Sequence, residues 1–522
     1  MIGNSKTNTS AENIVLVSPQ RWSTYMVPPM SFIELAAYLR SRNTPVSILD
    51  IKRTLSMIMT KKIESEIEDE IIERLSDLKP DWVGLPVYTV DYWAVMNLAK
   101  RLKQRLTGVK IVVGSVHATA RPNDFLFADS PIDVVCIGEG EEVLYELLNR
   151  NKLGLYYENI QGIAFFDGQK MQRTPSRQLT KDLSHLPPPA YDMVDMEFYV
   201  KPQQMLIRRL ILRGTYIYTG RGCPYQCSFC ASSMLYETQG LKRIVRYRPI
   251  EQIVDTLLML KNTYEIDSFY ILDDTFTITE SRVYKFCDLY ESKGLKMPWA
   301  CDARVNQATV EMLTKMKHAG CKQLDFGVES GSDESLKRMH KGITTEQIYK
   351  AFDLCRTVGM RSFANLMFNT PGETEEDVRL SLECIKKIKA NELNIGLTIP
   401  FLGTPLFAEY IGDNFTIEDY HIYEDPNLYT KIVDKRFKLS KHNMDSEKLL
   451  RQAYFKYILL KRIVPVTLEP WYWKIVLTSP RRLSYLKFMI QLWKSIFLRY
   501  SFYIRHNYKR IFKFTDNQKD SL

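Results

Sequence analysis

Three cysteines stand close together in a run that reads Gly-Cys-Pro-Tyr-Gln-Cys-Ser-Phe-Cys and supplies Cys223, Cys227 and Cys230. Cysteine thiolates are soft ligands that bind iron–sulfur clusters or zinc. Three thiolates can hold three corners of a 4Fe–4S cluster and leave the fourth iron open to a substrate, whereas a closed zinc site requires four ligands. The nearest further candidates, Cys287 and Cys301, lie far along the chain. The run therefore favours a cluster with chemistry at its open corner over a zinc knuckle.

The remaining composition is that of a large enzyme from a reducing compartment. The chain has 522 residues and nine cysteines, and its length is sufficient for two or three domains. No N-terminal signal pattern is present, so we expect a cytoplasmic protein with reduced thiols. We predict that the six cysteines outside the run are buried apolar residues. They are Cys136, Cys287, Cys301, Cys321, Cys355 and Cys384.

The cysteine run follows a short predicted strand at residues 215–219. This arrangement resembles the radical S-adenosylmethionine (SAM) superfamily, and the residues around the cysteines are similar to its cobalamin-associated branch, which includes hopanoid methylases and the anaerobic magnesium-protoporphyrin ester cyclase. The resemblance implies that the free iron binds the amino and carboxylate groups of SAM. Reduction then yields methionine and a 5'-deoxyadenosyl radical that takes hydrogen from an unactivated carbon, while the protein positions the reactants.

Strands and helices alternate after the cysteine run. With the strand before the cysteines they form six strand–helix units, which predicts a partial (β/α)6 barrel over residues 201–410 with the cysteine loop after its first strand. In parallel barrels the chemistry gathers at the carboxyl ends of the strands. The further predicted strands are 268–272, 299–304, 323–328, 361–368 and 394–400.

Polar residues stand at three of these strand ends, where a sheet core would not tolerate them unpaired. They are Asp273 and Asp274, Asp302 and Arg304, and Glu329 and Ser330. Solvated strand ends would explain each pair alone, but together they favour a binding site. The resemblance places Asp274 near the amino group of SAM, Arg304 near its carboxylate, and Glu329 or Ser330 near its ribose, which also matches opposite charges.

A turn at residues 369–374, Asn-Thr-Pro-Gly-Glu-Thr, resembles the family pattern Gly-x-Pro-Gly-Glu-Thr with Asn369 in place of the first glycine. Asparagine tolerates the left-handed backbone that such a turn requires. We expect Glu373 to begin the following helix.

The first 150 residues predict a doubly wound parallel sheet, because apolar strands alternate with helical patterns. Ligands of such sheets lie beyond the carboxyl ends of the strands. Gly114, His117 and Gly138 fall in the predicted loops there. These segments resemble the cobalamin-binding domain of the same branch, which implies cobalamin as a third cofactor. The cobalt-ligating motif Asp-x-His-x-x-Gly is absent; the nearest match, at residues 419–421, lies in another region. A structural domain without cobalamin, and a histidine without a cofactor role, remain the alternatives.

Residues 151–200 predict a β-hairpin, centred on Asp167-Gly168, and a proline-rich linker at 186–190 between the two domains. Residues 411–522 predict a helical region whose last part is basic and aromatic. Between 466 and 514 ten Lys/Arg and one Glu are interleaved with aromatic residues. This pattern is typical of helices that lie on anionic lipid, although a helical cap packed on the barrel or a nucleic-acid contact has the same composition.

Taken together, these features predict a radical SAM enzyme with a 4Fe–4S cluster, SAM and cobalamin. We expect it to methylate an unactivated carbon or form a carbon–carbon bond in a hydrophobic substrate such as a lipid. Its expected partners are an external electron donor such as ferredoxin or flavodoxin and the inner surface of the membrane, and nucleic acid is not favoured. The alternatives are modification of a peptide or tRNA, and a non-catalytic iron–sulfur or cobalamin sensor.

Overall fold

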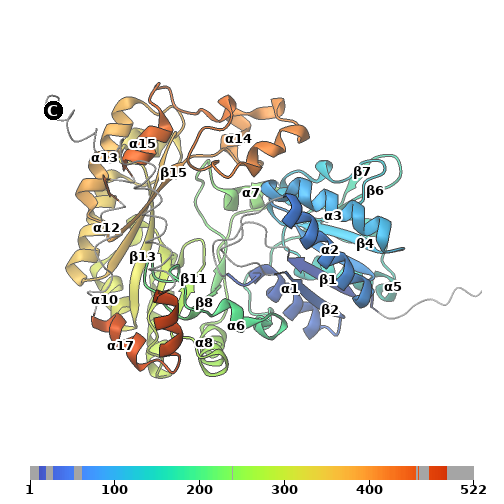
Figure 1. Cartoon of the computed structure of the whole chain (residues 1–522), viewed down its shortest axis with the longest axis horizontal. Coiled ribbons are helices and arrows are strands. Elements are labelled where there is room, and N and C mark those ends of the chain that lie inside the picture. Colours follow the sequence, from blue (N-terminus) through green and yellow to red (C-terminus); the bar gives the residue numbers. More distant parts are fainter. Residues whose placement is uncertain are drawn as a thin grey trace, which may run out of the picture.

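A computed structural model describes residues 11–18, 27–51, 61–237, 239–453, 456–457 and 470–490. Two α/β domains lie side by side, and helix α7 (Ala231–Glu237) lies between them (Figure 1). The described helices include none that is long and apolar enough to cross a membrane.

The described part of the first domain is built on a seven-stranded sheet in the order β2-β1-β3-β4-β5-β6-β7. The first five strands of the chain, β1 to β5, are parallel to one another, as the doubly wound prediction required. The strands are β1 (Ile14–Ser18), β2 (Val46–Asp50), β3 (Trp82–Pro86), β4 (Lys110–Gly114), β5 (Val134–Cys136), β6 (Ile163–Phe166) and β7 (Met171–Arg173).

Helices cover both faces of this sheet. One face packs on α1 (Met30–Ser41) and α5 (Glu141–Leu153), and the other on α2 (Lys61–Leu78) and α3 (Tyr92–Arg105). The short helix α4 (Val116–Ala120) follows β4. Because β1 lies between β2 and β3, the strand order reverses there, and the carboxyl ends around this reversal are where such sheets bind ligands.

The hairpin predicted between the domains is present but belongs to the first sheet. Strand β6 pairs with β5 in antiparallel register, with Val135 opposite Ala164, and β7 pairs with β6. The proline-rich stretch that follows contacts the second domain, because the Pro187 carbonyl accepts a hydrogen bond from Arg248 Nη1 at 3.0 Å.

The second domain is a parallel sheet of six strands in the described chain, in the order β15-β14-β13-β12-β11-β8, which confirms the partial barrel. Its strands are β8 (Gly214–Ile217), β11 (Ser268–Ile271), β12 (Trp299–Ala303), β13 (Cys321–Glu329), β14 (Arg361–Phe368) and β15 (Glu392–Leu397). Its outer face is covered by α8 (Ile250–Tyr264), α9 (Glu280–Ser292), α10 (Val310–His318), α12 (Thr345–Val358) and α13 (Glu375–Ile388).

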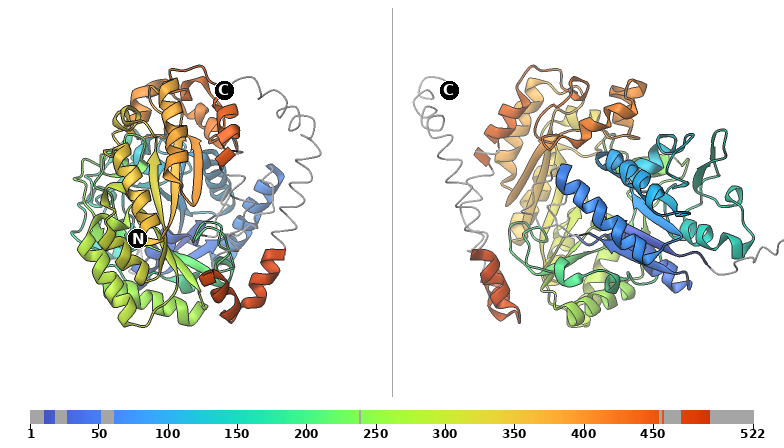
Figure 2. Two further views of the ribbon diagram at one scale, coloured as in Figure 1. Left: turned by 90° about the vertical axis from the view of Figure 1, so that its left-hand side faces the viewer. Right: turned by 45° about the vertical axis from the view of Figure 1, so that its right-hand side comes forward.

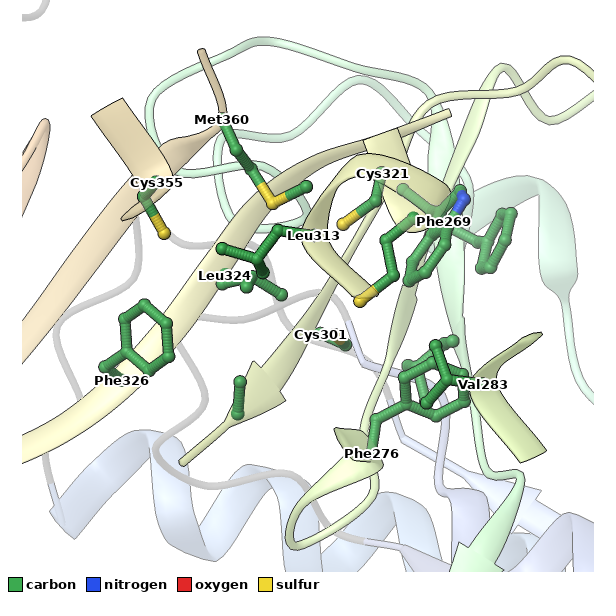
Figure 3. Packing of buried hydrophobic residues seen from close by; sticks show 14 of the residues in the cluster. Phe269, Phe276, Val283, Cys301, Leu313, Cys321, Leu324, Phe326, Cys355 and Met360 are labelled. Carbon is green, nitrogen blue, oxygen red and sulfur yellow. The ribbon is translucent and has the colours of Figure 1, made fainter. Parts of the chain in front are cut away.

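The core between the barrel strands and these helices contains several of the scattered cysteines. Cys301, Cys321 and Cys355 lie among Leu324, Phe326 and other apolar side chains (Figure 3). All six cysteines outside the cysteine run are buried, which confirms that they act as small apolar residues.

The turn after β14 departs from the sequence expectation at Glu373. Helix α13 begins at Glu375 with Thr374 as its N-cap, so Glu373 lies before the helix. Its buried carboxylate instead accepts a hydrogen bond from the Asn369 backbone N–H at 2.8 Å and lies 3.1 Å from His442 Nε2. Asn369 does adopt the left-handed conformation, with φ of 59°.

Segments after the barrel pack on both domains. Helix α14 (Pro405–Tyr410), the 3₁₀ segment η8 (Ile417–Glu424) and α15 (Ser446–Ala453) lie at one end of the barrel, and α17 (Pro470–Thr478) lies at the opposite end (Figures 1 and 2). Tyr420 of η8 reaches the first domain, where its hydroxyl donates a hydrogen bond to Asp124.

Candidate functional site

The three cysteines lie on the loop between β9 (Gly220–Arg221) and α7, directly after the first barrel strand. Cys227 is buried, and Cys223 and Cys230 are partly exposed. The loop is preceded by Gly222, which has φ of 98°. A side chain at this position would lie 2.2 Å from Tyr236 Oη and 2.3 Å from the Ile244 carbonyl oxygen, so only glycine fits the entry to the loop.

Hydrogen bonds fix the loop at both ends. The Asp273 carboxylate accepts the backbone N–H groups of Thr219 at 2.6 Å and Gly220 at 3.1 Å. Further along, the Ser228 N–H donates to the Met339 carbonyl, and the Ser228 carbonyl accepts the Leu406 N–H, each at 3.0 Å. Asp273, which the sequence grouped with the SAM-binding residues, is therefore committed to positioning the cysteine loop.

The thiols suit a cluster better than a single ion. Within the described ranges, no three His, Cys, Asp or Glu side chains are arranged to hold one metal ion. A cluster takes one thiolate on each of three irons, so its ligands need not converge on one point. Burial raises the pKa of Cys223 to about 11 and also raises that of Cys230. These thiols are neutral until metal ligation displaces their protons.

Arg304 lies directly against the cysteine loop. Its guanidinium lies 3.6 Å above the centre of the Tyr225 ring, and Nη1 lies 3.9 Å from Cys227 Sγ. Nε and Nη2 are buried without a hydrogen-bond partner among the described residues. Leaving such donors unpaired is costly, so this guanidinium fits a carboxylate ligand such as that of SAM.

Glu329 is aimed by an irregularity in its strand. The register between β13 and β14 shifts between Gly327 and Glu329, and Glu329 has φ of 65°. Its Oε1 accepts a hydrogen bond from Lys341 Nζ at 2.8 Å, while the buried Oε2 has no partner in the described chain. This free acceptor fits a ligand hydroxyl. The Ser330 hydroxyl, by contrast, is hydrogen-bonded within the protein. It lies 3.1 Å from Ser381 Oγ and accepts a hydrogen bond from the Ser332 N–H at 3.2 Å.

Asp274 completes the polar residues in front of the cysteines. It is exposed, and its Oδ1 accepts a hydrogen bond from Ser232 Oγ at 2.8 Å. Ser232 lies two residues after Cys230. The structure thus brings Asp274 and Arg304 to the cysteine loop, with a carboxylate for an ammonium group and a guanidinium for a carboxylate.

The first domain presents Gly114 and Gly138 at the ends of β4 and β5. Gly138 has φ of 83°, and a side chain there would meet the Gln239 side chain at 2.3 Å. Its N–H donates to Thr119 Oγ1 at 3.1 Å. Both glycines are partly exposed and lie at the edge that the doubly wound topology assigns to a ligand.

His117 is enclosed. It is 1% exposed, stacks on Tyr92 and packs edge-on against Tyr420 of η8. Nε2 lies 3.1 Å from Asp124 Oδ2, and burial lowers the pKa of the imidazole. The structure therefore places this side chain in the contact between the first domain and η8, and any role toward cobalamin remains a prediction.

Buried and partly buried ion pairs join the two domains beside the cysteine loop. Arg221 Nη2 lies 2.6 Å from Glu141 Oε1, and Arg246 Nη1 lies 2.9 Å from Glu139 Oε2. Arg248 of the barrel also pairs with Glu34 of α1. Arg221 precedes the cysteine run, and the two glutamates flank Gly140 after β5.

The sequence analysis did not predict these pairs, although the acidic run at residues 138–141 and the arginine before the cysteine run carry the signal. These ion pairs hold the carboxyl ends of the first sheet's strands against the strand that leads to the cysteines.

Comparison with known proteins agrees with this arrangement. Residues 217–385 match the radical SAM superfamily, and residues 23–148 match the B12 binding domain. The chain is 27% identical over 438 residues to an uncharacterized methyltransferase of Pyrococcus horikoshii, covering 84% of this chain and 89% of that protein. It is 25% identical over 372 residues to the anaerobic magnesium-protoporphyrin IX monomethyl ester cyclase of Cereibacter sphaeroides, covering 70% and 58% of the two chains.

The fold is shared with a solved structure. The radical SAM methyltransferase TsrM of Kitasatospora setae, determined with cobalamin and a 4Fe–4S cluster bound, superposes with a TM-score of 0.61 at 19% identity and covers 77% of this chain and 78% of its own. The two domain matches imply a 4Fe–4S cluster and SAM for the barrel and support cobalamin for the first domain.

Proposed function

We propose that this chain, a radical SAM enzyme with a B12-binding domain, methylates an unactivated carbon of a small-molecule substrate. The observation that carries the proposal is the set of buried, unpaired polar atoms beside the cysteine loop, Nε and Nη2 of Arg304 and Oε2 of Glu329. A non-catalytic sensor, or a protein that only stores a cluster, would not need an unpaired guanidinium and carboxylate that can bind SAM next to the cluster.

Each residue has a distinct task in this proposal. Cys223, Cys227 and Cys230 would hold three corners of the cluster, Arg304 the carboxylate of SAM, Asp274 its ammonium group, and Glu329 a ribose hydroxyl. When bound, these cofactors supply a substrate radical and a transferable methyl group. The ion pairs from Arg221 and Arg246 to the first domain would keep the cobalamin edge facing the barrel. The six further cysteines are buried, so electrons would come from an external donor such as ferredoxin or flavodoxin.

Cobalamin removal tests the reaction. Protein from cobalamin-supplied cells should carry a corrinoid without cobalt–histidine ligation, because His117 is 1% exposed and enclosed by Tyr92, Phe125 and Tyr420. With substrate it should form S-adenosylhomocysteine, the product of methyl donation by SAM. Cobalamin-free protein should keep its cluster and still cleave SAM to methionine and 5'-deoxyadenosine, but form no S-adenosylhomocysteine. Absorption and electron paramagnetic spectra report the corrinoid, and chromatography reports the products.

A protein that takes up no cobalamin under any condition would contradict methylation. It would leave ring closure, or another radical reaction of the barrel alone, as the function. Modification of a peptide or tRNA is a further alternative, which a comparison of small molecules in a deletion strain would separate from the proposal.

We further propose that the end of the chain contacts anionic membranes and so favours a hydrophobic substrate. The described part of this region mainly packs on the barrel: Tyr472, Val476 and Tyr485 are buried against residues 206–212. Several neighbouring side chains remain exposed beside basic residues. They are Leu477, Leu483, Leu486 and Ile490. Residues 491–514, outside the described ranges, add six Lys/Arg and no acidic residue.

Liposome flotation tests this contact. The intact protein should float with anionic vesicles at low salt and be released as salt rises, because exposed charges are screened. A chain that ends after Ile490 should lose flotation but keep its cluster, since Tyr485 still anchors the packed part through its hydrogen bond to Asp267 at 2.6 Å. Neutral vesicles are the control. If the intact protein ignores anionic vesicles, the tail has only a packing role.

A further inference from the structure

The inner face of the barrel sheet is partly exposed along β14 and β15, whereas residues 206–212 pack against it at Tyr216 and Tyr270. Along β14 the side chains that point toward the covering helices are buried, whereas Phe363, Asn365 and Met367 on the opposite face are partly exposed. On the neighbouring strand Asn394 is exposed, and its Nδ2 donates to Asn365 Oδ1 at 2.8 Å. Sites of parallel barrels lie at the carboxyl ends of the strands, next to this partly exposed part of the face.

Two aspartates lie side by side on this face. Asp302 of β12 is in register with Asp325 of β13. Asp325 is buried and satisfied, since it accepts hydrogen bonds from Arg208 Nε at 2.9 Å and Gln323 Nε2 at 2.6 Å. Asp302 is partly exposed and forms no ion pair with any Lys, Arg or His of the described chain. With both carboxylates ionised, Arg208 balances only one of the two charges.

A buried hydroxyl points to the same place. Tyr270 of β11 is in register with Ala300, two residues before Asp302, so its side chain lies on the same face. The residue is 2% exposed, and no described donor bonds its Oη. The Asp302 carboxyl lies beside it, and the hydroxyl lowers the pKa of that carboxyl by hydrogen bonding. The hydroxyl oxygen can therefore still accept a hydrogen bond from a ligand.

The charge around Asp302 selects the ligand. Burial, followed by the charge of Asp325, raises the pKa of Asp302 to about 8. Tyr270 and Arg208 act against this shift, and Asp274 adds to it. A carboxyl in this state becomes a carboxylate most readily when a cation arrives. A single carboxylate without a cationic partner suits an organic ammonium ion, which it can bind through a charge-assisted hydrogen bond.

We propose that Asp302 and Tyr270 form a subsite for a protonated amine of the substrate. The proposal rests on the proposed function, because it places this amine on the barrel face below Arg304, where the reacting molecule would lie. The Asp302 carboxylate is the counter-ion of the ammonium group, and the Tyr270 oxygen accepts one of its N–H donors. Arg208 keeps Asp325 neutralised behind them, so that one negative charge remains for the ligand.

The test uses the reconstituted protein with its cluster and SAM, and three small probes of similar shape: n-butylamine, 1-butanol and butyrate. Saturation-transfer NMR titrations give their affinities. Butylammonium should bind at least tenfold more tightly than the alcohol, and butyrate should not bind. Asp302→Asn should lose this preference, and Tyr270→Phe should weaken amine binding severalfold. Asp288→Asn on the outer helix α9 removes the same charge elsewhere and should change nothing.

The pH dependence of the unaltered protein provides a second measurement that does not depend on a variant folding. The probe amine stays protonated up to about pH 10, the range of a lysine side chain. Because Asp302 ionises around pH 8, amine affinity should rise between pH 7 and pH 9, and stay constant in Asp302→Asn.

Equal affinity for amine and alcohol, or an affinity that does not change with pH, would overturn the subsite. Loss of SAM binding in Asp302→Asn would do so as well, since it would assign Asp302 to the cofactor. Failure of the unaltered protein to build a cluster or cleave SAM is a different result, which would remove the proposed function itself.

Discussion

Cys227→Ala should abolish both the cluster and all cleavage of SAM. The described chain offers three thiols at this loop, and each would ligate a separate iron, so the loss of one leaves a corner without its protein ligand. Cys227 is the most enclosed of the three, and its sulfur lies next to Arg304, so no solvent-exposed side chain can take its place. Anaerobic reconstitution followed by visible absorption, iron counting and product analysis measures the effect.

Cys355→Ala is the matched control. This thiol is buried in the outer core of the barrel, on α12, and takes no part in the cysteine loop (Figure 3). Its loss should lower stability by about 1 kcal/mol for a small cavity and leave iron content and SAM cleavage unchanged. Wild-type cleavage by Cys227→Ala would refute the radical SAM mechanism, whereas loss of the cluster in both variants would point to general unfolding.

Local patterns predicted the elements and the cysteine loop. The spacing of Cys223, Cys227 and Cys230 is set within nine residues, and strand–helix alternation reports on neighbouring segments. The six parallel strands and the doubly wound sheet follow from such local signals, because parallel strands need crossover helices and the crossovers have one hand. The loop after the first barrel strand therefore carries the cysteines in the structure as it does in the prediction.

Residues whose role depends on distant partners were not predictable in this way. Glu373 was expected to begin a helix, but its carboxylate is held by His442, 69 residues later. The arginine before the cysteine run finds Glu141, 80 residues earlier. The aromatic residues after Pro470 were ambiguous for the same reason: Tyr472 could equally insert into lipid or pack on the barrel, and only the tertiary contacts decide.

The strand-end residues divide into two kinds that the sequence could not separate. The side chains of Asp273 and Ser330 form hydrogen bonds with other groups of the protein. Arg304 and Glu329 instead have buried polar atoms without a described partner. All four are polar residues at the same end of parallel strands, so their types and positions are equivalent in the sequence. The two kinds differ in whether their buried donors and acceptors have hydrogen-bond partners, and this depends on the folded structure.

Arg304→Met should remove most of the affinity for SAM while the cluster survives. A hydrogen bond between charged groups contributes about 1.5–3 kcal/mol, and about 1.4 kcal/mol corresponds to a tenfold change in affinity. Loss of the guanidinium should thus weaken SAM binding by roughly 10- to 100-fold. The cluster should persist, because Arg304 touches Cys227 Sγ only at 3.9 Å and ligates no iron. Equilibrium dialysis with SAM and the iron content report the two effects separately.

Two further substitutions separate charge from geometry at this position. Arg304→Lys keeps the charge but loses the planar fork and its stacking on Tyr225, so it should restore only part of the affinity. Tyr225→Phe keeps the ring beneath the guanidinium and removes only the hydroxyl that accepts Gln307 Nε2 at 3.0 Å, so SAM binding should stay close to normal. If Arg304→Met binds SAM as tightly as the unaltered protein, the unpaired nitrogens serve another ligand. The acceptor at Glu329 would then be the remaining support for a SAM site at this strand end.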